Sequence, residues 1–89
     1  MLRLTIRSQT PEEVVLDVAG WVSGADVYIL EQEGTRLLGE AKRLVLDLTR
    51  VKFIDPEGIV LLQRWSGERL VLRGGSLFIR TLLEEHGLV

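Results

Sequence analysis

The chain has 89 residues, 46% of them hydrophobic, and carries eleven Lys and Arg against thirteen Asp and Glu, a net charge of −2. This length predicts a single domain over residues 1–89, and the composition argues against disorder and against a nucleic-acid binder. The absence of cysteine excludes disulfides and thiolate zinc sites. The longest apolar run, 58–62, is too short to span a bilayer, so we expect no membrane insertion and a cytoplasmic location.

The first two segments have the pattern of strands. Leu2, Leu4 and Ile6 alternate with polar residues, which indicates a strand with one buried face. Turn residues then lead into a second β-rich run at 14–22. A hairpin is the simplest link between the two strands.

After Ser23 and Gly24 the apolar residues recur at spacings of three and four, which predicts an amphipathic helix that ends near Gly39. The residues of this stripe are Val27, Leu30, Gly34, Leu37, Leu38 and Ala41. Trp21, Tyr28 and Ile29 lie off the stripe. We interpret these three as residues at the edge of the core, with a contact in a homodimer as the alternative.

Residues 43–48 are apolar and bounded by charge, so they predict a buried strand with neighbours on both sides. A second helical pattern follows and ends near Ser66, with Gly58, Leu61, Leu62 and Trp65 facing the sheet. This assignment places Ile59 and Val60 on the flank or outer face of the helix. Two adjacent exposed apolar residues there could form a docking patch.

Residues 69–73 read as a further short strand, and a last helix is expected to begin after Ser76 as N-cap and to end before Gly87. The predicted order is therefore β-β-α-β-α-β-α. Strands that alternate with helices favour parallel pairing. The expected fold class is α/β, a four-stranded mixed sheet with helices packed on it.

The stretch Asp55-Pro56-Glu57-Gly58 has the composition of a helix start. An N-cap Asp accepts a hydrogen bond from an unpaired helix N–H, and Pro at the first helical position loses no bond. A first-turn carboxylate such as Glu57 faces the positive end of the helix dipole. Gly58 permits close approach of the helix to the sheet.

The wider stretch "LVLDLTRVKFIDPEGIVLL" resembles the signature of the STAS family, the anti-sigma factor antagonist-like domains. That signature is an apolar strand ending in Asp, a short loop with an aromatic residue, and Asp-Ser-Ser-Gly opening a helix. Asp47 matches the acidic residue of the strand, and Asp55 and Gly58 match the ends of the motif. The resemblance covers the whole chain and implies a STAS-like fold without enzymatic activity.

The chain departs from this pattern between Asp55 and Gly58, where Pro56 and Glu57 replace the two serines. In the regulated antagonists, the second of these serines is phosphorylated by a partner kinase. Glu57 occupies this position and cannot accept a phosphoryl group. It carries one negative charge where a phosphoserine carries about 1.5 to 2. Glu57 either imitates the phosphorylated state or fits a different interface.

Other polar residues suggest further roles. Asp47, Asp55 and Glu57 could converge and bind Mg²⁺, and Asp55 with Glu57 could act as an acid–base pair in a small enzyme. Neither has a phosphate-binding loop or a nucleophile beside it, so no cofactor, metal or catalytic residue is expected. His86 at the end of the last helix is assigned a structural role, and the segment 74–76 is interpreted as a turn with an N-cap.

The sequence therefore predicts a module for protein–protein interaction in bacterial signalling. The resemblance implies an anti-sigma factor or a switch kinase as partner. The alternative is an accessory subunit of a lipid-transport ABC system, and an enzyme is a distant third. The residues expected to contact the partner are Asp55, Pro56, Glu57, Gly58, Ile59, Val60 and Gln63.

Overall fold

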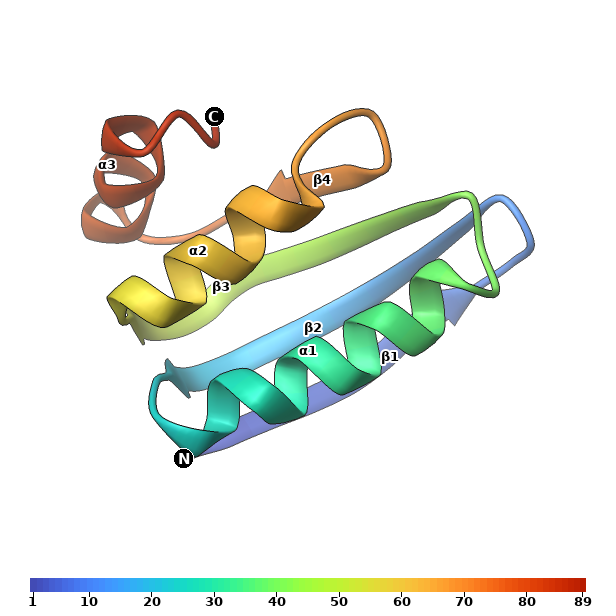
Figure 1. The fold of residues 1–89 in the computed structure, drawn as a ribbon, viewed down its shortest axis with the longest axis horizontal. Helices are drawn as coiled ribbons and strands as arrows, with labels where there is room; N and C mark the ends of the chain where they lie inside the picture. The colour runs from blue at the N-terminus through green and yellow to red at the C-terminus, as the bar shows by residue number, and fades with distance from the viewer.

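The computed structural model describes residues 1–89 as one four-stranded sheet with three helices (Figure 1). In chain order the elements are β1 (Leu2–Gln9), β2 (Glu13–Val22), α1 (Ala25–Leu38), β3 (Arg43–Ile54), α2 (Pro56–Trp65), β4 (Leu70–Arg73) and α3 (Leu77–Glu85). The predicted order β-β-α-β-α-β-α and the α/β fold class are confirmed.

The strands lie in the order β1-β2-β3-β4, so sequence neighbours are also neighbours in the sheet. β1 and β2 form the predicted antiparallel hairpin, whereas β2 pairs with β3 and β3 with β4 in parallel. The sheet is therefore mixed. β3 has a strand on each side, as its apolar sequence indicates.

β3 is twice as long as predicted, because its pairing with β2 resumes at Arg50 and reaches Ile54, so that the strand includes the polar residues Thr49, Arg50 and Lys52. These polar residues end the apolar run in the sequence, which suggested that the strand stops at residue 48. The register with β2 shifts twice along this extension, between Asp17 and Ala19 and between Gly20 and Trp21. Such shifts are typical of β-bulges, which break the simple alternation on which the prediction rested.

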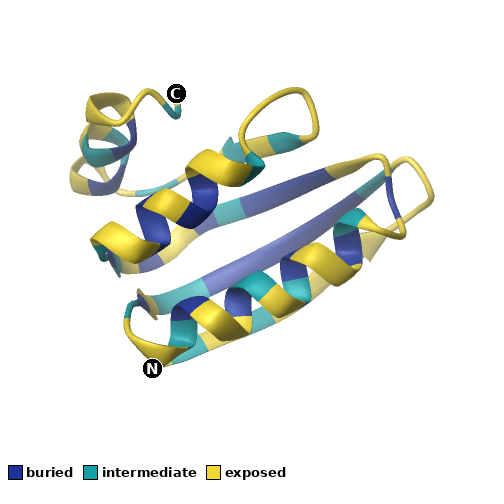
Figure 2. Cartoon of the chain, in the orientation of Figure 1, coloured by how far each residue is buried: buried dark blue, intermediate teal, exposed yellow.

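The hydrophobic core lies on one face of the sheet only. Alternate residues of the two central strands, among them Leu16 and Leu46, form one buried cluster with the buried side chains of α1, α2 and α3. In Figure 1, α1 and α2 lie over the front of the sheet and α3 lies beyond α2. Figure 2 shows the buried residues of these helices turned toward the sheet and the exposed ones away from it. We call the opposite side of the sheet the outer face.

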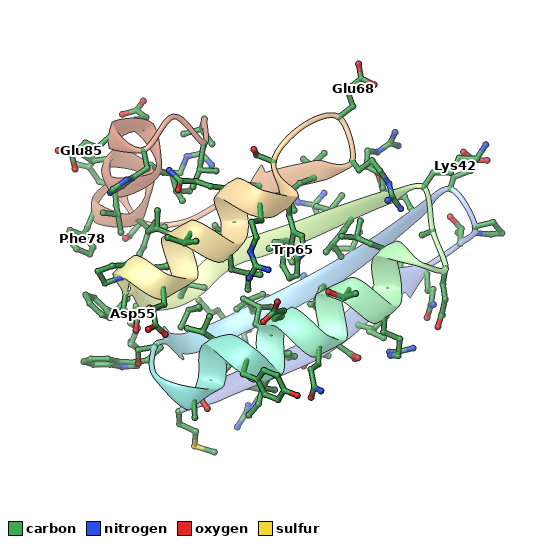
Figure 3. The ribbon with its side chains drawn as sticks, viewed as in Figure 1. Lys42, Asp55, Trp65, Glu68, Phe78 and Glu85 are labelled. Carbon is green, nitrogen blue, oxygen red and sulfur yellow. The ribbon has the colours of Figure 1, made fainter.

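α1 and α2 approach each other closely at Gly34. A Cβ atom built on this glycine would lie 2.2 Å from the indole ring of Trp65. Figure 3 shows Trp65 pointing from α2 toward α1. The glycine in the apolar stripe of α1 is therefore explained by the indole ring that packs across it.

Two predictions of side-chain placement are wrong. Ile59 is only 3% exposed and belongs to the core, because α3 lies along that side of α2 and covers it. Trp21, Tyr28 and Ile29 are 51%, 60% and 51% exposed, so they do not lie at the edge of the core. None of the three helices is long and apolar enough to cross a membrane.

Candidate functional site

The candidate site lies where the parallel strands β2 and β3 end and the helices α1 and α2 begin. The loop after β2 leads through Gly24 into α1, and the end of β3 leads through Asp55 into α2. The Asp55 N–H donates to the carbonyl of Val22 at 2.9 Å, which ties the two chain turns together. The carboxyl ends of parallel strands are a common position for binding sites in α/β folds.

Asp55 connects both helix starts through its side chain. Its Oδ1 accepts a hydrogen bond from the Gly58 N–H at 2.9 Å, the N-cap bond that the sequence predicts. Its Oδ2 accepts a second bond from the Gly24 N–H at 3.0 Å, which the sequence did not indicate. One carboxylate therefore caps α2 and also holds the loop that opens α1.

Glu57 differs from Asp55 in having no partner. It lies in the first turn of α2, it is exposed, and no hydrogen bond or ion pair within the chain engages its carboxylate. The dipole of α2 stabilises a negative charge at this end of the helix. Glu57 therefore presents an uncompensated carboxylate to the solvent.

At Gly58, α2 approaches the sheet closely. A Cβ atom at this position would lie 2.8 Å from Cγ2 of Ile54 and 3.0 Å from Cγ1 of Val22. The prediction that this glycine permits close packing is therefore confirmed. It also means that Gly58 is buried and shapes the site from beneath.

A groove of about 400 Å³ separates α1 from α2. Tyr28 and Glu31 line it from α1, and Glu57 and Val60 line it from α2. An ion pair of 3.0 Å between Arg64 and Glu31 crosses from one helix to the other. The groove is therefore partly aromatic, and Glu57 is the carboxylate on its α2 side that has no partner.

A second hollow of about 430 Å³ lies between α2 and α3 and is almost entirely apolar. Phe53, Val60 and Phe78 contribute to its walls, and Phe78 is 58% exposed. Gln63 donates from Nε2 to the carbonyl of His86 at 3.2 Å and so joins α2 to the end of α3. Figure 3 shows Phe78 at the same end of the molecule as Asp55.

The structure thus brings most of the expected contact residues together and separates two of them from the surface. Pro56, Glu57 and Val60 are exposed on the ridge of α2 between the two hollows. Gly58 and Ile59 are buried beneath that ridge. Asp55 is half-buried, and Gln63 is exposed but engaged with α3.

The other polar arrangements do not assemble into a site. Asp47 lies on the outer face of the sheet, where its Oδ1 accepts from the Thr49 N–H at 3.0 Å, and no group of three or more carboxylate, His or Cys side chains comes together. His86 is the C-cap of α3, as its structural assignment requires. Ser76 caps α3 by accepting from the Ile79 N–H at 3.2 Å, which accounts for the segment 74–76.

Four residues line the two hollows but were not among those expected to contact the partner protein: Tyr28, Glu31, Arg64 and Phe78. A signal for Phe78 was present, because Ile79 and Leu83 mark the buried stripe of α3 and leave Phe78 off it. The groove between α1 and α2 carried no such signal. It depends on the spacing of two helices that are 17 residues apart in the chain.

The chain resembles known proteins in its sequence family and in its fold. The family model described as "Mlab, STAS domain" matches residues 6–89. No curated protein sequence matches the chain. Among solved structures, the anti-sigma factor antagonist SpoIIAA in its unphosphorylated form is 19% identical with a TM-score of 0.79, over 97% of this chain and 82% of that one.

The Bacillus cell fate determinant SpoIIAA in its phosphorylated form is 20% identical with a TM-score of 0.70, over 97% of this chain and 85% of that one. An anti-sigma factor antagonist from Mycobacterium paratuberculosis is 23% identical with a TM-score of 0.72, over 99% of this chain and 80% of that one. Likeness at these identities establishes a shared fold.

Proposed function

Because the chain belongs to the STAS domain family, we propose that residues 1–89 act as one protein-binding module of the anti-sigma factor antagonist type in bacterial signalling. The partner is an anti-sigma factor or a switch kinase in the cytoplasm, and the module itself is not an enzyme. The observation that carries this proposal is the free carboxylate of Glu57 beside the exposed Val60, on the ridge between two hollows.

The contact surface proposed here consists of Pro56, Glu57 and Val60, with Tyr28 and Phe78 on either side. It combines half-exposed apolar groups with one unpaired charge, a mixture that is typical of protein interfaces. Val60 is 53% exposed and contributes to both hollows. Asp55 and Gly58 support this surface from below, and Gln63 lies at its margin.

We further propose that the module has no phosphorylation switch at the position where the family carries its serine. Glu57 presents a permanent charge at the start of α2. The affinity for the partner therefore depends on this fixed side chain and not on phosphorylation by a kinase. A loss of this charge changes the interaction with the partner without greatly changing the fold, since a first-turn carboxylate contributes only about 0.3–1 kcal/mol.

The lack of a phosphoacceptor also favours the second candidate function, an accessory subunit of a lipid-transport ABC system. Such a subunit stays bound to its ATPase and has no need of a switch at Pro56 or Glu57. The same surface of α2 serves both functions. The neighbouring genes separate them, because a sigma factor or kinase gene supports the first and permease and ATPase genes support the second.

The contact surface is tested by capturing the native partner with tagged protein and comparing two charge insertions. Val60→Glu places a charge on the ridge, whereas Ile29→Glu makes the same change at an equally exposed residue of α1 outside the groove. We expect Val60→Glu to lose the partner and Ile29→Glu to retain it, with similar thermal midpoints. Equal retention or equal loss by the two variants would exclude this surface.

Glu57→Ser then tests the role of the charge against the partner so identified. A gain in affinity means that Glu57 imitates the phosphorylated, released state, and a loss means that the partner offers a basic group to it. Affinity is measured by calorimetry. If it were unchanged, the segment 55–58 would serve only as the start of α2.

A further inference from the structure

The outer face of the sheet has no helix packed on it. The buried side chains of α1, α2 and α3 other than glycine all belong to the single cluster on the opposite face. Cross-strand partners share a face, and the strand registers place Arg3 beside Ala19, Ala19 beside Arg50, and Asp47 beside Arg73. Arg3, Ala19 and Asp47 alternate with core residues along their strands, and the register sets Arg50 and Arg73 beside them, so these residues lie together on the outer face.

The basic side chains without a partner are confined to the strands. Seven of the eleven Lys and Arg residues form an ion pair or donate to a backbone carbonyl: Arg7, Arg36, Lys42, Arg43, Arg64, Arg69 and Arg80. The four that do neither are Arg3, Arg50, Lys52 and Arg73, on β1, β3 and β4. Three of these four lie on the outer face.

The carboxylates without a partner show the opposite distribution. They are Asp26, Glu57, Glu68, Glu84 and Glu85, all on helices or in the loop before β4. The chain as a whole is acidic, yet its outer face carries the unpaired positive charge. We propose that the outer face of the sheet is a second docking surface, which binds an acidic patch on a partner protein and is separate from the surface on α2.

The side chains beside the unpaired arginines suit a protein partner. Trp21 lies on the outer face and is 51% exposed, and its ring centroid is 5.6 Å from that of Phe53. Phe53 also lines the hollow between α2 and α3, so it marks the boundary between the two surfaces. Aromatic residues and arginine are enriched at the centres of protein interfaces, where lysine is depleted. The guanidinium group also pairs with carboxylates through two parallel hydrogen bonds.

Two features disfavour a polyanion of phosphates as the occupant. Asp17 and Asp47 lie side by side in the middle of the outer face, where their carboxylates repel phosphate groups. Only three unpaired arginines accompany them, whereas nucleic-acid binders contact about 6–10 phosphates and lipid-binding clusters contain about 4–8 basic residues.

A second copy of the chain fits the outer face poorly. Two copies stacked about a two-fold axis through the centre of the face would set the Asp17 and Asp47 pair against its own copy and leave the surrounding arginines facing one another. The geometry therefore favours a different protein with clustered Asp and Glu residues.

The test measures, by NMR at low salt, the binding of a synthetic peptide of alternating Glu and Phe to the full chain. We expect amide shifts on β1, β3 and β4, and about tenfold weaker binding by Arg3→Glu/Arg50→Glu, because each reversal turns attraction into repulsion. Lys42→Glu is the control with the same kind of charge change, at the far end of the molecule from Asp55 (Figure 3). It should bind the peptide as the wild type does.

Four outcomes would overturn the proposal: shifts confined to the helices, equal weakening by Lys42→Glu, tighter binding of phosphatidylglycerol vesicles or a single-stranded oligonucleotide, and self-association through this face in sedimentation velocity. Val60→Glu keeps the peptide affinity of the wild type if the two docking surfaces are independent. That variant therefore distinguishes failure of the outer-face proposal from failure of the proposed contact surface on α2.

Discussion

The two faces of the sheet are formed by the same strands, but helices cover only one of them. Val14 and Val15 are adjacent in β2, and both are nearly inaccessible, at 0% and 7% exposed. Val14 lies under the helices and belongs to the core cluster, whereas Val15 lies on the outer face and does not. Low exposure alone therefore does not identify a core residue in this fold.

The difference follows from where the helices pack. On the covered face, three helices exclude water from a continuous apolar cluster, and helix starts and glycines fix how closely they approach. On the outer face, burial comes only from neighbouring side chains of the strands, and charged residues lie among the valines. The first face therefore contributes more to stability, and the second can accommodate charged side chains.

The largest expected loss of stability is that of Val14→Ala, compared with Val15→Ala on the other face. Val14→Ala should lower the free energy of unfolding by about 2–3 kcal/mol, through two lost methyl groups and a cavity that the helices cannot close. Val15→Ala should cost about half as much, because flexible side chains of the outer face can move into the space. Urea unfolding of both variants measures this, and equal losses would show that the outer face is packed as rigidly as the core.

Gly58→Ala tests how closely α2 must approach the covered face. The added methyl group would lie 2.8 Å from Ile54 and 3.0 Å from Val22, so something must move. We expect a loss of about 1–3 kcal/mol from overpacking, despite the better helix propensity of alanine. Gly67→Ala is not a suitable control because of its positive φ. Thr35→Ala at an exposed site of α1 is suitable and should be nearly neutral.

Asp55→Ala removes a link between the two helix starts and should have the next largest effect. Loss of an N-cap costs about 0.5–2 kcal/mol. The second bond to Gly24 places the expected value in the upper half of that range. Asp55→Asn keeps an acceptor for the Gly58 N–H and should recover part of the loss in thermal melts. If alanine and asparagine were equally destabilising, the N-cap bond would not be the main contribution.

The sequence predicted the element order, the N-caps of α2 and α3, and the close packing at Gly58, because these depend on local patterns. It misplaced Ile59, since the prediction allowed α2 only one buried side and α3 covers a second. It also ended β3 too early, because bulges let polar residues continue a strand. Two features depend on tertiary contacts, which no local pattern contains. One is the groove between α1 and α2. The other is the separation of unpaired basic residues on the strands from unpaired acidic residues on the helices and the loop before β4.

The smallest expected effect concerns Asp47 on the outer face. Hydrogen bonding from Thr49, through its side chain and then its backbone, lowers the pKa of Asp47, and the charges of Arg7 and Arg73 lower it further. A carboxyl group with a lowered pKa in the folded state stabilises the fold above the pKa of the unfolded chain, about 3.9. This stabilisation is lost as the pH falls through the lower, folded value.

Thr49→Val keeps the backbone hydrogen bond and the β-branched shape but removes the hydroxyl group. We therefore expect the pKa of Asp47 in the folded state to move back toward its ordinary value, followed by NMR titration of the carboxyl carbon. Thr5→Val, on the outer face of β1 beside Asp17 rather than Asp47, should leave that pKa where it is. An unmoved pKa in Thr49→Val would assign the shift to Arg7 and Arg73 instead. Arg73 would then be partly committed to Asp47, and only Arg3 and Arg50 would remain free to attract an acidic partner.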